Sequence, residues 1–248
     1  MLAIMIFVGV VDSCIKQPDY PNVPQIQLGS FSLRRGTGAN FGFDTLVITI
    51  KFKDGNGDIG IGQTDLARQD GKYVSPWYWV YDTTNISNYG YTTDGNPADL
   101  PSNTSYKFIN YKARNLNFSG ITIPATYNCV NWAIGKNVGS SKVDTLFITQ
   151  NSLAYTLNMD LYTRRLTSDP YVYYDPGAND CSPNEFKAAL PDLSNDRKSS
   201  PIEGSFTYKF EYLGFAAKFS GQYLKFNITI TDREGNVSNT VEADLIVQ

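Results

Sequence analysis

Apolar and polar residues alternate along many short segments of this chain, with the period of two that is typical of β-strands. The clearest segment is Thr45–Phe52, which is rich in β-branched residues, and pleated sheets favour such side chains. Polar turn pairs such as Asp54-Gly55 separate the segments, so the pattern predicts an all-β sandwich or barrel. The expected strands are Ile26–Leu33, Thr45–Phe52, Trp77–Tyr81, Leu116–Ile123, Val143–Thr149, Tyr155–Tyr162, Phe206–Tyr212, Tyr223–Thr231 and Val237–Val247.

No segment carries a sustained helical period. The best candidate for a helix is the short stretch Asn184–Leu190, which follows Pro183. Asp94–Thr104 and Ser168–Gly204 are expected to be long loops, and the second is rich in proline, Asp, Asn and Ser. Irregular segments of roughly 35 residues are uncommon in compact domains and are usually functional or disordered.

Two sequence echoes bear on the domain organisation. They predict two sandwich modules, residues 26–137 and residues 138–248, the second with the long loop 168–204. Because strands and turns have few sequence solutions, one large sandwich with long loops is the alternative. Asp44–Thr49 recurs as Asp144–Thr149 with five of six residues identical, and Ile48–Ile50 followed by Gly55-Asn56 recurs as Ile228–Ile230 followed by Gly235-Asn236.

The first eleven residues form an almost unbroken apolar run that stops just before Cys14. A helix needs ~20 residues to cross a bilayer, so the run is too short to span one and instead suits the apolar part of an export signal. No Lys or Arg precedes the run, which export signals usually have, and a buried N-terminal strand is the alternative. A cysteine directly after such a run is similar to the lipobox of bacterial lipoproteins, in which the cysteine is acylated.

The expected layout is therefore a signal peptide over residues 1–13 and a lipidated Cys14 that begins a tether over residues 14–25. Pro18, Pro21 and Pro24 recur every three residues, which is the period of polyproline II and indicates a semi-rigid spacer. With Cys14 lipidated, Cys129 and Cys181 remain as an even pair, and an exported protein would join them in a disulfide. Two unpaired buried thiols are the alternative.

Charge and composition narrow the function classes. The chain holds 21 Lys and Arg against 24 Asp and Glu, with a net charge of −3, and no basic stripe points to a nucleic-acid partner. The absence of histidine removes the usual general base and the commonest zinc ligand. We therefore expect no enzyme. A hydrolase with an Asp/Glu pair, of the kind that cleaves glycosides, is the least favoured alternative.

The sharpest local motif follows the strongest strand, where Asp54, Asn56 and Asp58 alternate with glycines. Tight turns at the glycines let the oxygens converge on a hard cation such as Ca²⁺. Asp65 falls twelfth counting from Asp54, where an EF-hand supplies its last ligand, but Ile59 stands where an EF-hand has Gly. The motif leaves two interpretations, a Ca²⁺ site that uses these four side chains and a plain hairpin turn with positive φ.

An aromatic strand offers a second candidate site. Alternation places Trp77, Trp79 and Tyr81 on one face of their strand. If that face is exposed, it forms a stacking platform for a glycan; if it faces inward, it belongs to the core.

The quoted motifs resemble those of uncharacterised outer-membrane lipoproteins of the Bacteroidota. The likeness lies in Cys14, in the entry Tyr20–Ile26, and in the block Lys53–Gly60, whose middle Asp is replaced here by Asn56. The segment Ile230–Asn239 resembles the closing hairpin of bacterial immunoglobulin-like domains. The resemblance implies an immunoglobulin-like β-sandwich anchored in the outer membrane through lipid, and no activity.

These features favour a non-catalytic lipoprotein that serves as a binding or accessory subunit of a cell-envelope protein complex. The alternative is a surface lipoprotein that binds glycans.

Overall fold

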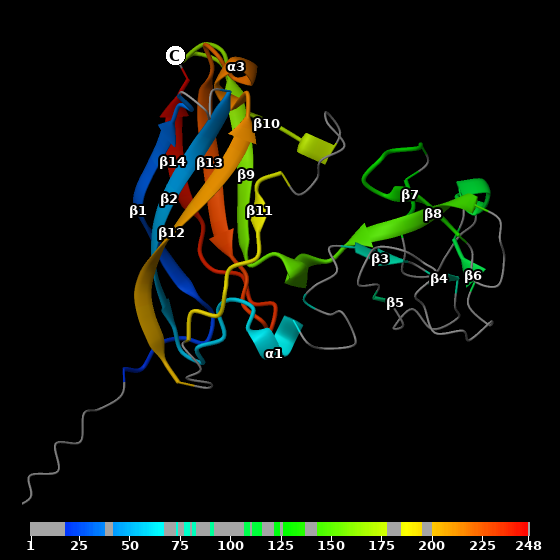
Figure 1. Cartoon of the computed structure of the whole chain (residues 1–248), viewed down its shortest axis with the longest axis horizontal. Helices are drawn as coiled ribbons and strands as arrows, with labels where there is room; N and C mark the ends of the chain where they lie inside the picture. The colour runs from blue at the N-terminus through cyan, green and yellow to red at the C-terminus, as the bar shows by residue number, and fades with distance from the viewer. Residues whose placement is uncertain are drawn as a thin grey trace, which may run out of the picture.

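A computed structural model gives the structure of the chain. It describes residues 18–37, 42–66, 73, 77–79, 81–82, 90–91, 107–109, 111–115, 122–124, 126–136, 143–177, 185–194 and 200–247. Within these residues the protein is built from antiparallel sheets, and a three-stranded and a five-stranded sheet lie face to face as the layers of a sandwich (Figure 1). The prediction of an all-β sandwich is therefore confirmed.

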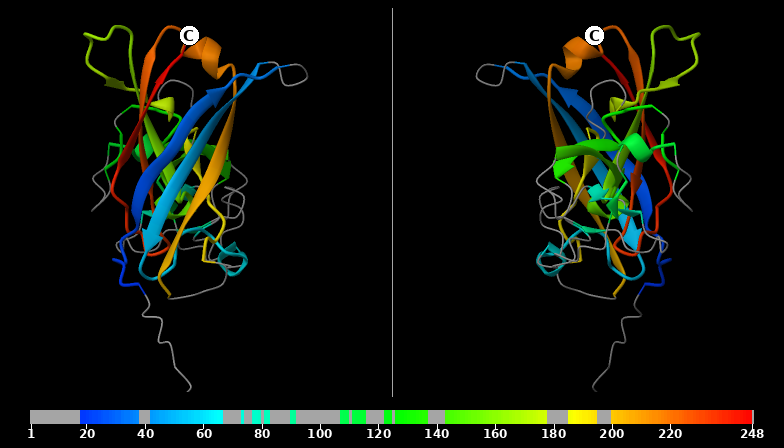
Figure 2. Two further views of the ribbon diagram at one scale, coloured as in Figure 1. Left: turned by 90° about the vertical axis from the view of Figure 1, so that its left-hand side faces the viewer. Right: turned by 90° about the vertical axis from the view of Figure 1, so that its right-hand side faces the viewer.

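The first layer is a three-stranded sheet in the order β1-β2-β12. Its strands are β1 (Gln25–Arg34), β2 (Phe43–Asp54) and β12 (Ile202–Leu213). β2 lies in the middle and pairs antiparallel with both neighbours, from Phe43 opposite Leu213 to Asp54 opposite Ile202. The long strands cross the whole height of the sandwich (Figure 2).

The second layer has the order β10-β9-β13-β14, and β11 also pairs with β9. Its strands are β9 (Leu157–Arg164), β10 (Val172–Tyr173), β11 (Lys187–Ala188), β13 (Tyr223–Ile230) and β14 (Val241–Ile246).

Two expectations for residues 168–204 are wrong. The region carries β10 and β11 instead of one irregular loop, and part of the expected helix Asn184–Leu190 is strand β11. Phe186, Ala188 and Leu190 are buried while Lys187 and Ala189 lie further out. That is the period of a strand, so pairing with β9 overrides the weak local signal for a helix.

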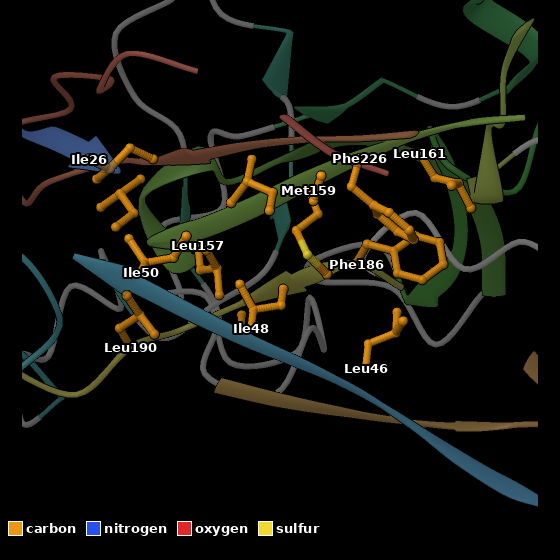
Figure 3. Packing of buried hydrophobic residues seen from close by; sticks show 14 of the residues in the cluster. Ile26, Leu46, Ile48, Ile50, Leu157, Met159, Leu161, Phe186, Leu190 and Phe226 are labelled. Carbon is orange, nitrogen blue, oxygen red and sulfur yellow. The ribbon is translucent and has the colours of Figure 1, made fainter. Parts of the chain in front are cut away.

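The main core fills the space between the two layers. Alternate residues of β2 and β9 point toward each other, and Phe186 and Phe226 pack between them with ring centroids 5.9 Å apart (Figure 3). The pattern is clearest in β13, where Leu224, Phe226, Ile228 and Ile230 are fully buried. Burial of an aliphatic or aromatic side chain stabilises a fold by roughly 1.5–3 kcal/mol, so this alternation fixes the register of the strands.

The remaining elements lie between β2 and β9 in sequence or at the end of β12. Strands β3, β5, β7 and β8 form a four-stranded sheet, β4 pairs with β6, and Ile109, Trp132 and Phe147 form a second, smaller core. These remaining elements are α1 (Gln63–Leu66), β3 (Trp77–Trp79), β4 (Tyr81–Asp82), β5 (Gly90–Tyr91), β6 (Lys107–Phe108), η3 (Tyr111–Ala113), β7 (Trp132–Lys136), β8 (Val143–Gln150), η4 (Ser152–Ala154) and α3 (Phe215–Lys218).

Among the described residues, we find no helix with the length and apolar character that a membrane span requires.

Strand pairing does not follow the division at residue 137 that the sequence echoes predicted. β2, from the first expected module, pairs along its whole length with β12 from the second. The echoed strands β2 and β8 lie in different sheets. The sandwich is thus assembled from both halves of the chain. Most expected strands are present; the described part of Leu116–Ile123 contains no strand, and Asp94–Thr104 lies outside the described residues.

Candidate metal centre

Three buried aspartates meet at the end of the sandwich where β2 ends, near α1 (Figure 1). Asp54, Asp58 and Asp232 each place a carboxylate oxygen within 4.8 Å of the others. Their exposed fractions are 0%, 9% and 1%. Carboxylates are rarely buried in the charged form without a partner, because the charged form loses its hydration, and the nearby Arg233 offsets only part of that cost at Asp58.

The turn after β2 positions the first two aspartates. Asp54 is the last residue of β2 and points inward, and its Oδ2 accepts a hydrogen bond of 2.9 Å from the Asp58 backbone N–H. The chain reverses through Gly57, whose φ of 67° lies in the left-handed region that favours glycine. The tight turn therefore returns the Asp58 side chain to the Asp54 side chain.

A second turn, after β13 in the opposite sheet, supplies the third aspartate. The Asp232 Oδ1 accepts from the Asn236 backbone N–H, and its Oδ2 accepts from the Asn236 amide, both at 2.8 Å. The Asp232 backbone N–H donates to the Asn236 carbonyl at 3.0 Å. The two turns are joined because the Arg233 backbone N–H donates to the Asp58 carbonyl at 3.2 Å.

Several oxygens at this end have no hydrogen-bond partner among the described residues. They are Asp54 Oδ1, both carboxylate oxygens of Asp58 and the amide Oδ1 of Asn56, all of them buried. An unpaired buried oxygen costs about 1–3 kcal/mol, and more when it is charged. Buried oxygens without a protein partner call for an ordered water or an ion, and the gathering of three carboxylates at this place favours a cation.

The electrostatics of the aspartate cluster also favour a bound cation. Burial raises the pKa of Asp54, and repulsion from Asp232 adds to the shift, while the backbone N–H groups of Asp58 and Gly57, and the Asp58 carboxyl when it is protonated, oppose it. Burial, followed by repulsion from Asp232 and Asp54, raises the pKa of Asp58 to about 7. In the protein alone, neighbouring carboxylates thus resist ionising together, and a bound cation would remove that resistance.

The donor set fits Ca²⁺. The ligands on offer are carboxylate and amide oxygens, which hard cations prefer, with no nitrogen or sulfur donor in the cluster of described residues. Ca²⁺ binds oxygens at ~2.4 Å, so ligands on opposite sides of the ion stand ~4.8 Å apart. One carboxylate oxygen from each of the three aspartates lies within that distance of the others.

Asp65 does not join the cluster, so its assignment as a ligand is corrected. Its Oδ2 accepts from the Gly62 N–H at 3.0 Å and pairs with Arg233 Nη1 at 3.0 Å. Arg233 Nη1 also lies 3.6 Å from Asp192 Oδ2. The EF-hand count failed because a bend at Gly60, whose φ is 92°, stands between this turn and the short helix α1 that carries Asp65. Asp65 instead holds the arginine beside Asp232.

The chain is closely packed beside the cluster. The Ile61 N–H donates to the Leu190 carbonyl at 2.9 Å, and the Leu193 N–H donates to the Ile59 carbonyl at 3.1 Å. A Cβ on Gly60 would collide with the Pro191 carbonyl. Residues 59–61 are therefore fixed against the segment that follows β11.

The structure thus unites three of the predicted ligands, Asp54, Asn56 and Asp58, at one turn, and adds Asp232, which sequence reasoning missed. The echo of Ile48–Asn56 by Ile228–Asn236 marks the second turn, but it aligns Asp232 with Phe52 and so does not single out Asp232. The echo predicts a repeated module, and the structure shows that its two turns meet at one end of the sandwich.

The other predicted site residues are covered only in part. Cys129 is disulfide-bonded, and its Sγ lies 3.5 Å from the carbonyl oxygen of Gly177. Cys181 and Cys14 lie outside the described residues, so the Cys129–Cys181 pairing and the lipidation stay predictions. The same holds for the glycan platform, because the side chains of Trp77, Trp79 and Tyr81 are outside the described part of the structure.

Comparisons with protein-family models, curated proteins and solved structures found no significant match to this chain.

Proposed function

We propose that this protein is a non-catalytic cell-envelope lipoprotein whose β-sandwich is a binding or accessory module stabilised by Ca²⁺. The observation that carries the cation site is the buried cluster of Asp54, Asp58 and Asp232 with its unpartnered oxygens. Asp54, Asn56, Asp58 and Asp232 would hold the ion. By drawing the turns of the two sheets together, the ion would close this end of the sandwich.

The burial of the cluster favours a structural role over a catalytic one. A catalytic metal site keeps an open position for substrate or water, whereas all three carboxylates here are at least nine-tenths buried. A glycoside hydrolase would need two carboxylates that flank a bound sugar, and aspartates sealed in this way are poorly placed for that task.

The location in the envelope rests on the N-terminal pattern. Acylation of Cys14 would tether the sandwich to the outer membrane, with the segment that begins at Pro18 as the spacer. Changing Cys14 to Ala should move the protein from the membrane fraction to the soluble fraction. Continued membrane association of the variant would refute the anchor.

The cation site is tested by thermal unfolding of the full chain in excess Ca²⁺ and in EGTA. Saturation to about 100 times Kd stabilises a fold by about 2.7 kcal/mol. For a domain of this size the midpoint should rise by roughly 5–10 °C. The double variant Asp54→Asn, Asp58→Asn should show no rise. An equal midpoint of the parent protein in both buffers would remove the proposal.

A further inference from the structure

The segment that leads from the tether into β1 lies directly on the first of the two cluster turns. The Gly55 N–H donates to the Pro21 carbonyl at 2.8 Å. A Cβ on Gly55 would collide with the backbone of Tyr20 and Pro21. Gly55 stands between Asp54 and Asn56, so the incoming chain is seated on the turn that supplies most of the candidate ligands.

The same segment is also held by the second turn. The Ile26 N–H donates to Asn239 Oδ1 at 2.8 Å, and the Asn239 amide donates back to the Ile26 carbonyl at 2.9 Å. Asn239 is fixed in turn through Ser238, whose hydroxyl accepts from the Ile230 N–H at 3.0 Å. Ile230 ends β13, two residues before Asp232. The entering chain thus bridges both turns.

A third contact fixes Tyr20 to the sheet itself. Its hydroxyl donates to Glu203 at 2.7 Å, and the Lys53 ammonium lies 5.0 Å from the centre of its ring. These residues come from β12 and β2. Tyr20 therefore adds a docking contact that involves no candidate ligand.

We propose that the two turns carrying Asp54, Asp58 and Asp232 form a docking surface for the segment Tyr20–Ile26, and that a cation in the cluster fixes the direction in which the chain leaves the sandwich toward Cys14. This inference rests on the proposed cation site. The segment needs both turns at the right separation, and repulsion among the carboxylates works against that separation until a cation joins them.

Linkage makes the coupling reciprocal. If the cation favours docking of the segment, docking favours the cation by the same factor, and such couplings are typically about 5- to 150-fold. A change that weakens docking without touching the turns must then weaken Ca²⁺ binding. Tyr20→Phe is such a change, because it removes only the hydroxyl that binds Glu203.

The experiment combines amide hydrogen exchange with calorimetry on the full chain in detergent. Exchange is measured in Ca²⁺ and in EGTA at the amides of Gly55 and Ile26. The reference is the Asp169 amide, which donates to the Leu166 carbonyl in the turn between β9 and β10. We expect Ca²⁺ to slow Gly55 and Ile26 about 10-fold more than the reference. Calorimetry should show weaker Ca²⁺ binding for Tyr20→Phe, and no change for the control Tyr127→Phe, a tyrosine outside the docking contacts.

Three results are distinguishable. Selective protection of Gly55 and Ile26 together with weaker binding by Tyr20→Phe supports the docking proposal. Calcium binding that leaves these amides no more protected than Asp169, with equal affinity for both tyrosine variants, overturns it while the proposed function stands. If the parent chain does not bind Ca²⁺, the proposed cation site fails and this inference fails with it.

Discussion

The two ends of strand β2 both carry a buried, inward-facing aspartate, but the two side chains have different surroundings. Asp44, next to the start of β2, is 6% exposed, and its Oδ2 accepts a hydrogen bond of 2.7 Å from the Ala216 N–H in α3. Asp54, at the other end, faces two further carboxylates and keeps Oδ1 unpartnered within the described structure. Burial of an aspartate is therefore not what marks a cation site; the unpartnered oxygen and the neighbouring carboxylates are.

The packing of the two ends differs as well. Gly60, beside the cluster, has a φ of 92°, and its neighbour is the Pro191 backbone. Gly214, at the α3 end, has a φ of 72°, and a Cβ there would meet nothing within 4 Å. An added Cβ would meet backbone at Gly60 and open space at Gly214, so the same substitution at these two glycines should have unequal effects.

The largest effect is expected from Gly60→Ala. Positive φ costs an alanine about 1–2 kcal/mol, and the collision with Pro191 forces a backbone shift in addition. We expect a loss of about 3 kcal/mol or more in the free energy of unfolding, measured with urea. Gly214→Ala should cost only about 1 kcal/mol, from its φ alone. Equal losses would show that the end near the cluster is no more tightly packed than the other.

The next largest effect is the calcium dependence of stability, which should distinguish Asp54 from Asp44. In EGTA, Asp54→Asn should raise the free energy of unfolding, because it removes one of three carboxylates that repel one another. At a Ca²⁺ concentration of about 100 times Kd the parent protein should gain about 2.7 kcal/mol of stability, and Asp54→Asn should lose this gain. Asp44→Asn weakens one charge-assisted hydrogen bond and should cost about 1 kcal/mol in both buffers. A calcium-dependent effect of Asp44→Asn, or the absence of one for Asp54→Asn, would contradict the claim that Asp54 and not Asp44 belongs to the cation site.

A further effect is expected from pH in the absence of calcium. The pKa of Asp58 is raised to about 7 in the folded protein by burial and by repulsion from Asp232 and Asp54, and an unfolded Asp titrates near ~3.9. Between these values the folded state holds more protons, so stability should fall as pH rises from about 4 to about 7. Urea unfolding in EGTA at pH 5 and pH 7.5 measures the slope. Asp58→Asn should flatten it; an unchanged slope would place the titrating group elsewhere.

How far the sequence predicts this structure depends on how local each signal is. The strands of the sandwich were foreseen because alternation in segments such as Thr45–Phe52 is a local property. The turn Asp54–Asp58 was foreseen for the same reason. The location of Asp232 beside that turn was not, because it depends on how β13 and β2 face each other across the core.

The errors have physical causes of the same kind. Strand β11 is not predicted from the sequence because the proline-rich composition around it indicates a loop. Only its pairing with β9 makes it a strand. The division at residue 137 failed because local similarity between segments says nothing about which strands pair. Asp65 was placed in the site by counting residues, whereas the turn at Gly60 carries it to Arg233.

The most direct test of the cation site is calorimetric titration of Ca²⁺ into the full chain after its metal has been stripped with EGTA, at pH 7.5. We predict a single saturable site per chain in the parent protein and in Asp44→Asn, and no binding in the double variant Asp54→Asn, Asp58→Asn. An absence of binding in the parent, or unchanged binding in the double variant, would contradict the assignment of the cluster as a calcium site.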